Sequence, residues 1–160
     1  MKKIKYYFIS LLLVSVFTAC TPPLKNHEAR TIVFKTPKLA YADAGFVYDN
    51  GSDVKVEIFI AGHPVFTLEL DRKICLDGYC FKKKDFITKY LNSDYDEDIL
   101  HQIFLGKKIF DSEGLSLEPD GFSQTIFKKS SYQISYKVTH DTIRFRDKIS
   151  KILIKIKKLS

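Results

Sequence analysis

The feature that most constrains the fold of this chain is a strict alternation of apolar and polar residues, which recurs over residues 54–60, 66–71, 132–138 and 151–157. Successive residues of a β-strand point to opposite faces, so this period of two is typical of strands with one buried face. Turn signals separate the alternating segments: Asp49-Asn50-Gly51, Gly62-His63-Pro64, Asp77-Gly78 and Thr139-His140-Asp141. Because the connections are short, we expect neighbouring strands to pair antiparallel.

Two segments in the middle of the chain show helical spacing instead. Residues 85–92 and 94–105 each carry apolar residues three or four positions apart. In the second segment, Asp94 and Glu97 have the spacing of a capping box, and Gly106 follows the last apolar residue, where helices often end. We expect two short helices here, followed by an irregular connection over residues 111–123. The predicted fold class is therefore α+β, with an antiparallel sheet that curls round a helical insert.

The N-terminus is typical of a targeting signal. Three lysines within the first five residues precede a mostly apolar, uncharged run over residues 6–17. A membrane-spanning helix needs about 20 residues, so this run of 12 indicates a cleaved secretory signal. Residues 17–20, Phe-Thr-Ala-Cys, resemble the bacterial lipobox, in which the cysteine thiol receives a diacylglyceryl group, although Phe17 stands where Leu is usual. The alternative is an ordinary signal peptide with an incidental cysteine.

The expected organisation is a signal peptide over residues 1–19, a lipidated Cys20 with a tether over 20–30, and a single domain over 31–160. No Asp follows Cys20, which by resemblance to the common sorting rule favours a lipid anchor in the outer membrane, on its periplasmic face. Removing the signal leaves 23 basic and 19 acidic residues, a net charge of +4. This charge allows weak attraction to anionic lipid headgroups but is no signature of nucleic-acid binding.

Two cysteines flank the Asp-Gly step at residues 77–78, which is a strong signal for a two-residue hairpin turn. Such a turn places Cys75 opposite Cys80 on paired strands, with Cα atoms about 4.5 Å apart. Export delivers the chain to an oxidising compartment. We therefore predict a cross-strand disulfide; two reduced cysteines packed against the sheet are the alternative.

The sequence lacks the common patterns of catalytic and metal sites. The histidines, His27, His63, His101 and His140, have no metal-binding spacing, and neither a Gly-rich phosphate loop nor a Gly-x-Ser-x-Gly elbow occurs. We expect His101 to lie on the polar, solvated side of the second helix. The expectation is a protein that is not an enzyme and that carries no metal and no cofactor except the covalent lipid on Cys20.

The order of these segments resembles the LolB family, outer-membrane receptors that accept lipoproteins from the periplasmic carrier LolA. The resemblance rests on residues 66–70 (Phe-Thr-Leu-Glu-Leu), on 94–106 with its closing Leu-Gly, on the strands over 121–137 and on the closing strands over 141–157. It implies an antiparallel, half-open β-barrel with a two-helix insert. It also implies a monomer whose apolar cavity receives the acyl chains of client lipoproteins, with the membrane and a LolA-like carrier as further partners.

The resemblance implies two sets of site residues. A loop with an apolar tip that helps to insert the client into the membrane corresponds to Pro64, Val65 and Phe66. The inward-facing residues that would line the acyl-chain cavity are Val54, Val56, Ile58, Tyr132, Ile134 and Tyr136. Two alternatives stay open. The loop can be a plain hairpin with Phe66 in the core, and the protein can be a structural or interaction lipoprotein of the cell envelope, with a filled core and no ligand.

Overall fold

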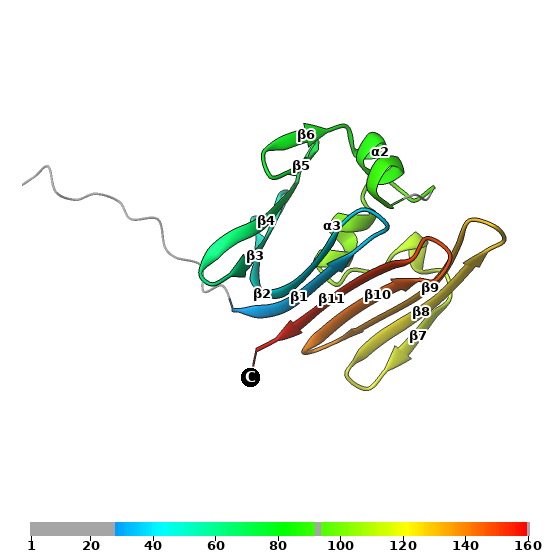
Figure 1. Ribbon diagram of the computed structural model, residues 1–160. Coiled ribbons are helices and arrows are strands. Elements are labelled where there is room, and N and C mark those ends of the chain that lie inside the picture. The colour runs from blue at the N-terminus through cyan, green and yellow to red at the C-terminus, as the bar shows by residue number, and fades with distance from the viewer. Residues whose placement is uncertain (1–27, 92–93, 160) are drawn as a thin grey trace, which may run out of the picture.

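The computed structural model describes residues 28–91 and 94–159, in which one antiparallel sheet curves round a helical insert (Figure 1). The predicted signal peptide and Cys20 lie outside these residues. The strands are β1 (Arg30–Lys35), β2 (Ala40–Asp49), β3 (Val54–Ile60), β4 (His63–Leu70), β5 (Ile74–Leu76), β6 (Tyr79–Phe81), β7 (Leu115–Glu118), β8 (Gly121–Lys128), β9 (Tyr132–Thr139), β10 (Thr142–Asp147) and β11 (Ile152–Lys158). The helical segments are α2 (Lys83–Phe86), the π-helical turn η1 (Ile87–Leu91), α3 (Ile99–Phe104) and the 3-10 turn η2 (Phe110–Ser112).

Within the described residues the sheet has 11 strands, in the order β6-β5-β4-β3-β2-β1-β11-β10-β9-β8-β7. Most neighbours are joined by short hairpins, but β1 pairs with β11, which places Arg30 opposite Lys158 and brings the two ends of the domain together. The edge strands β6 and β7 do not pair with each other, so the sheet is not closed into a barrel. The predicted α+β class and the half-open antiparallel sheet are confirmed at this level.

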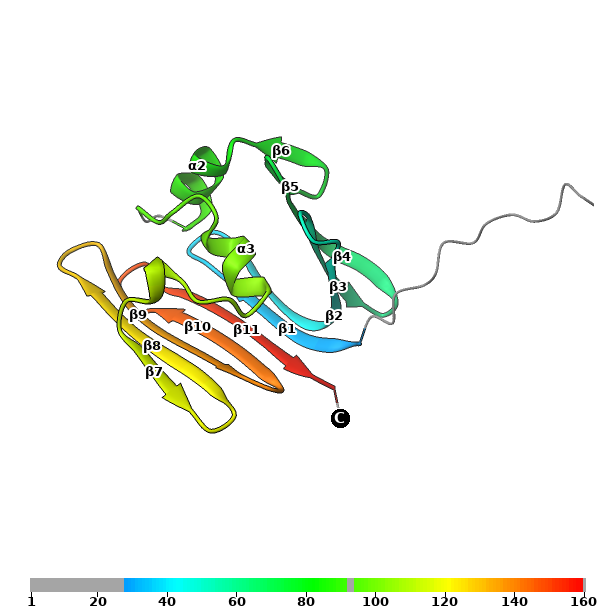
Figure 2. The same cartoon turned by 180° about the vertical axis from the view of Figure 1, so that it is seen from behind.

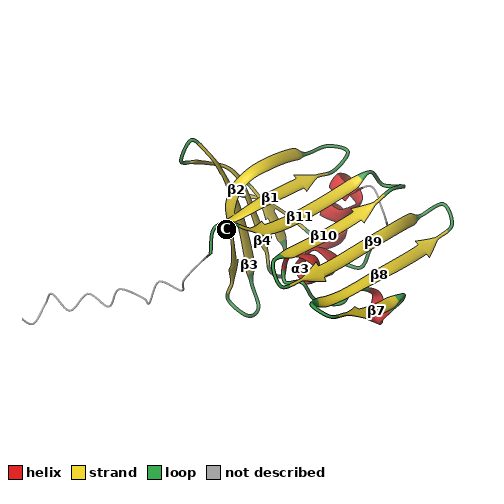
Figure 3. Ribbon diagram, turned by 90° about the horizontal axis from the view of Figure 1, so that it is seen from below, coloured by secondary structure: helices red, strands yellow, loops and turns green. Residues whose placement is uncertain are grey.

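The sheet turns a corner along β2, at Gly45. Residues 40–45 of β2 pair with β1, whereas residues 45–49 pair with β3. A Cβ atom on Gly45 would lie 2.1 Å from the carbonyl oxygen of Glu57 and 2.9 Å from Cδ1 of Ile32, so only glycine permits this close approach. Two walls result, one of β3–β6 and one of β1 with β7–β11. In Figure 3 the second wall is seen face-on, while β3 and β4 are seen on edge.

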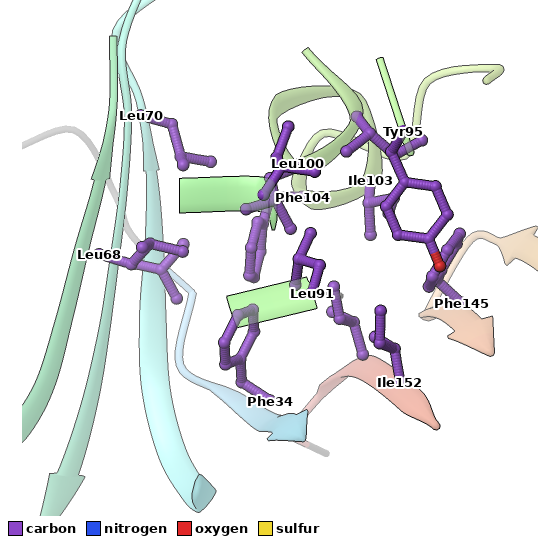
Figure 4. Packing of buried hydrophobic residues seen from close by; sticks show 14 of the residues in the cluster. Phe34, Leu68, Leu70, Leu91, Tyr95, Leu100, Ile103, Phe104, Phe145 and Ile152 are labelled. Carbon is purple, nitrogen blue, oxygen red and sulfur yellow. The ribbon is translucent and has the colours of Figure 1, made fainter. Parts of the chain in front are cut away.

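The insert covers the concave side of the sheet, between the two walls (Figure 2). Seven of its apolar side chains are at most 3% exposed: Phe86, Ile87, Leu91, Ile99, Leu100, Ile103 and Phe104. They pack on the inward positions of the strands, so that the ring of Phe104 stacks on that of Phe34 with 6.1 Å between centroids (Figure 4). One continuous hydrophobic core therefore joins the sheet to the insert.

The second helix is shorter than predicted, because it begins at Ile99 and not at residue 94. The predicted capping box is wrong. Asp98 stands at the start of α3 without a side-chain cap, and Oδ1 of Asp96 accepts the N–H of Asp98 at 2.8 Å. Such local side-chain bonds to the backbone compete with helix formation. Gly106 follows the helix with a φ of 64°, as the sequence predicts.

The connection after the insert is also more regular than predicted. Residues 111–123 contain β7 and the first residues of β8, which form a hairpin in which Leu117 lies opposite Phe122. The alternation over β7 is only four residues long, and Leu117 is 76% exposed at the sheet edge. A strand with so little buried surface has a weak sequence pattern, which is why the prediction of an irregular connection fails here.

Candidate functional site

The six residues predicted to line an acyl-chain cavity all lie on the concave face, and all are buried. Three come from β3 and three from β9, and none is more than 8% exposed: Val54, Val56, Ile58, Tyr132, Ile134 and Tyr136. They belong to the same hydrophobic cluster as the apolar residues of the insert. The apolar lining is therefore present, but in this structure the insert fills the space in front of it.

Several hollows lie at the surface and have charged walls. One of about 390 Å³ lies beside the insert, where Lys83 and Asp98 form an ion pair with 2.6 Å between Nζ and Oδ1. His101 of α3 also borders it, but its Nε2 is buried and has no hydrogen-bond partner among the described residues. The expectation that His101 is solvated is wrong, because α3 lies against the sheet and half-buries this side chain.

A polar contact ties the start of the insert to the sheet. Tyr95, which lies just before α3, donates its hydroxyl hydrogen to Oδ2 of Asp147 on β10. Asp147 is 1% exposed, and its Oδ1 accepts the backbone N–H groups of Gln133 and Ile149, each at 2.9 Å. Burial of a carboxyl group is costly unless its oxygens are hydrogen-bonded, and these three donors offset that cost. Figure 4 shows Tyr95 next to Phe145, the neighbour of Asp147 two residues earlier on the same strand face.

Two further side chains of the sheet bind the backbone that follows α3. The hydroxyl of Tyr136 donates to the carbonyl oxygen of Lys107 at 3.0 Å. Gln124 accepts the N–H of Ile109 at 2.9 Å and donates to the carbonyl oxygens of Ile109 and Glu113 at 2.9 and 2.8 Å. Burial raises the pKa of the Tyr136 phenol well above its usual value, so this hydroxyl keeps its proton and continues to donate.

The other end of the insert rests on aromatic contacts. Phe86 of α2 and Tyr90 of η1 lie with ring centroids 4.6 Å apart, and Phe81 of β6 packs edge-on to each, at 5.9 and 5.7 Å. The ammonium group of Lys89 lies 4.8 Å from the centroid of the Phe81 ring. This end of the insert is therefore joined to the β5–β6 hairpin by packing and a cation–π contact.

That hairpin carries a disulfide between Cys75 and Cys80, whose Cα atoms are 3.9 Å apart and face each other in the register. Asp77 and Gly78 form the turn, with φ values of 48° and 85°, as a type I′ turn requires. Oδ1 of Asp77 also accepts the N–H of Thr67 at 2.8 Å, which ties the turn to β4. The bond thus holds the register between the edge strand β6 and its neighbour β5, which contain only three residues each.

The loop predicted to insert into a membrane is a two-residue turn made by Ala61 and Gly62, with φ values of 51° and 80°. Pro64 lies beyond the tip, opposite Phe59 in the β3–β4 ladder, and is exposed. Val65 is half-buried and packs against the core. The tip of the turn, at residues 61–62, therefore precedes the predicted residues 64–66.

The prediction that Phe66 belongs to an exposed loop tip is wrong. It is 0% exposed, and its ring lies 5.1 Å from that of Phe34 and 4.8 Å from that of Tyr41. The alternation that puts Leu68 on the buried face also puts Phe66 there, two residues away. The exposed apolar side chain near the turn is Ile60, which is 52% exposed. The alternation predicts it on the buried face with Val54, Val56 and Ile58, but the register shifts between Ile58 and Phe59.

Neither membrane-spanning helices nor metal ligands mark a site in the part of the chain that the structure describes. No helix in residues 28–91 and 94–159 is long and apolar enough to cross a bilayer, and no three His, Cys, Asp or Glu side chains there are placed to hold a metal ion. Comparison with models of known protein families finds no match, and comparison with curated proteins finds none. The concave face and its insert are therefore the structural basis for a functional inference.

Proposed function

We propose that this protein is a lipid-anchored envelope lipoprotein that binds acyl chains on the concave face of its sheet and receives or inserts lipoproteins, as LolB-like receptors do. The observation that carries the proposal is the cover on that face. A continuous apolar concave surface lies under an insert that consists of short, irregular helical segments. Such a cover can be displaced, and the surface beneath it has the character of an acyl-chain site.

The insert has little helical stability of its own. Its α2, η1 and α3 segments contain four, five and six residues. Isolated helices shorter than about 12 to 15 residues are marginal in water, so these segments depend on their packing against the sheet. A ligand that covers the same apolar surface would replace that packing and release the insert.

An acyl chain that enters from water can supply free energy for this exchange. Burial of one methylene from water contributes about 0.8 kcal/mol, so a chain of about 15 methylenes offers on the order of 12 kcal/mol, whereas a chain handed over by a carrier gains only the difference between the two apolar sites. The hydrogen bonds that Tyr95, Tyr136 and Gln124 make across the insert each contribute on the order of 1 kcal/mol. The remaining free energy of acyl-chain burial can offset the loss of packing between the insert and the sheet.

The proposed anchor would hold this site at the destination membrane. Diacylglyceryl on Cys20 places the tether in the outer membrane, on the periplasmic face, where a LolA-like carrier can deliver its client without covalent chemistry. Arg30 lies opposite Gly45, and Gly45 opposite Ile58, so the start of β1 and the β3–β4 turn lie at the same end of the sheet. The exposed Ile60 beside that turn would thus be near the anchored end of the domain.

Binding of a fluorescent fatty acid to the purified lipoprotein tests the proposal. We expect saturable binding by the wild type, and tighter binding by Tyr95→Phe, because that variant loses a tie between insert and sheet. Tyr79→Phe, at a side chain that is 76% exposed, is the matched control and should bind like the wild type. Circular dichroism verifies that each variant is folded. If neither the wild type nor Tyr95→Phe binds the probe, the proposal is wrong.

One observation favours a second function, a structural or interaction lipoprotein without a ligand. The concave residues are fully buried, and the hollows beside the insert and on the outer face have charged walls. Hydrogen exchange separates the two functions. If the insert opens for a ligand, amides of α3 exchange faster than those of β9 and β10. If the core is permanently filled, all three exchange only through global unfolding.

A further inference from the structure

The outer, convex side of the second wall carries a cluster of basic side chains on β1, β10 and β11, named here the convex basic face. Its members point away from the insert and are exposed: Lys35, Arg144, Arg146, Lys155 and Lys157. The register places Arg144 of β10 directly opposite Lys155 of β11. Two residues further along, Leu153 of β11 lies between Arg146 of β10 and Lys35 of β1. Figure 3 views the sheet from this side.

No acidic residue stands at an outward position of β9, β10, β11 or β1, as the register and the alternation of exposure show. The charge of one outward lysine of β9 is neutralised by a carboxylate on the edge strand β7. Lys137 pairs with Glu118 of β7 at 2.5 Å, and this contact holds the pKa of the Glu118 carboxyl below its usual value. Among the described residues, the members of the convex basic face form no ion pair. The face therefore presents uncompensated positive charge to its surroundings.

This arrangement is unfavourable for the isolated domain, since like charges directly opposite on adjacent strands repel. Arg144 and Lys155 are such a pair, and Lys157 lies two residues after Lys155 on the same face of β11. A shallow hollow of about 420 Å³ lies over these side chains and is lined by Lys137, Thr139, Thr142, Arg144, Lys155 and Lys157. An anionic surface laid against the face would remove the repulsion and could place phosphate groups in the hollow.

The chain topology places this face near the predicted anchor. β1, which contributes Lys35, is also the strand from which the N-terminal segment leaves the domain at Arg30. Arg30 follows Cys20 by ten residues, which span at most about 36 Å when fully extended. A lipid on Cys20 would hold the start of β1, where Thr31 lies opposite Lys157 of the convex basic face, within that distance of a bilayer.

We propose that the convex basic face docks on the anionic phospholipid headgroups of the membrane that holds the lipid anchor. The inference rests on the anchor of the proposed function and adds an orientation to it. With the convex side on the bilayer, the concave side and its insert face away from the membrane, towards an arriving carrier. Headgroup attraction of this kind decays within a Debye length, so docking depends on salt concentration.

Lysine labelling of the full lipoprotein in vesicles tests this orientation. The protein is reconstituted into phosphatidylcholine vesicles and into phosphatidylcholine vesicles that contain phosphatidylglycerol, and an amine-reactive reagent is followed by mass spectrometry. We expect Lys35, Lys155 and Lys157 to react several-fold more slowly on the anionic vesicles. The exposed Lys82, Lys84 and Lys129, on the insert side and the β8–β9 turn, should react equally on both. About 1 M salt, where the Debye length is about 3 Å, should abolish the difference.

A matched pair of variants separates the face from net charge. Arg144→Gln/Lys155→Gln/Lys157→Gln should abolish the protection of Lys35, whereas Lys82→Gln/Lys84→Gln/Lys129→Gln removes the same charge and should retain it. Equal labelling on both vesicles, or equal loss in both variants, would overturn the proposal. Failure of the wild type to float with phosphatidylcholine vesicles would instead contradict the anchor. Slower labelling only after addition of an acidic protein would assign the face to a protein partner and would also overturn it.

Discussion

The hydroxyl of Tyr95, at the start of the insert, is hydrogen-bonded to the buried carboxyl of Asp147 on β10, 52 residues away in the sequence. The contact joins the two parts of the molecule that the proposed function requires to separate. It also ties the chain just before α3 to the sheet.

Loss of this contact should weaken the fold. Tyr95→Phe removes one of three donors to a carboxyl group that is 1% exposed, and we expect the free energy of unfolding to fall by about 1 to 3 kcal/mol. Urea denaturation followed by circular dichroism measures the change. Tyr79→Phe is the control. An unchanged free energy of unfolding for Tyr95→Phe would show that the contact contributes nothing to stability.

Stability should fall steeply at alkaline pH, because burial raises the pKa of Tyr136. An unfolded tyrosine releases its proton near pH 10. Above that pH the unfolded chain binds fewer protons than the folded one, so the free energy of unfolding decreases as pH rises, by up to about 1.4 kcal/mol per pH unit from this group. Its stabilising contribution is therefore fully present below about pH 10.

Tyr136→Phe should make this alkaline slope shallower, even though the variant loses the hydrogen bond to the Lys107 carbonyl and is less stable near neutral pH. Urea denaturation between about pH 9 and pH 11 measures the slope. The pKa of Tyr132 is also raised by burial, so part of the slope should remain in the variant. Identical slopes in wild type and variant would contradict the assignment to Tyr136.

The corner of the sheet should not tolerate a side chain at Gly45. A Cβ atom there would meet the Glu57 carbonyl oxygen at 2.1 Å, so Gly45→Ala must push β2 and β3 apart. We expect a loss of about 2 kcal/mol or more in the free energy of unfolding, as for other overpacked sites. Ala42→Val, at an exposed position of the same strand, should cost far less. Similar losses in the two variants would contradict a special role for the corner.

The convex basic face should show opposite effects on stability and on membrane docking. Lys155→Glu replaces a repulsive pair with Arg144 by an attractive one, and we expect the free energy of unfolding to rise by about 0.5 kcal/mol. The same variant should lose protection from lysine labelling on anionic vesicles. Lys129→Glu, in the β8–β9 turn, should change neither quantity. A fall in stability for Lys155→Glu would show that the face is not under electrostatic repulsion.

Local patterns were sufficient for much of the sheet. The alternation over residues 54–60 coincides with β3, and the Asp-Gly step places Cys75 opposite Cys80. Both depend only on neighbouring residues: the pleat sets the period of two, and a type I′ turn sets the register beside it. Phe66 is a further example. Its position in the alternation correctly predicts that it is buried, whereas the resemblance to a family with a protruding loop wrongly places it at an exposed tip.

Features set by distant contacts could not be predicted in this way. The contact of Tyr95 with Asp147 joins the chain before α3 to β10, and the corner at Gly45 depends on the approach of β3. The convex basic face depends on β1 pairing with β11, the two ends of the domain. Its basic residues are spread over more than 100 positions of the sequence, from Lys35 to Lys157.

The sequence by itself determined the apolar face of the strands with clear alternation, β3, β4, β9 and β11, the turn at Asp77-Gly78 and which cysteines pair, because these follow from periodicity and turn chemistry within a few residues. The tertiary structure alone decided that the apolar concave face is covered. Leu100 and Phe104 fill that face only because α3 is held between the two walls. The same apolar pattern is compatible with an open cavity or a filled one, since burial of an apolar surface is favourable whether a ligand or the chain itself supplies the cover.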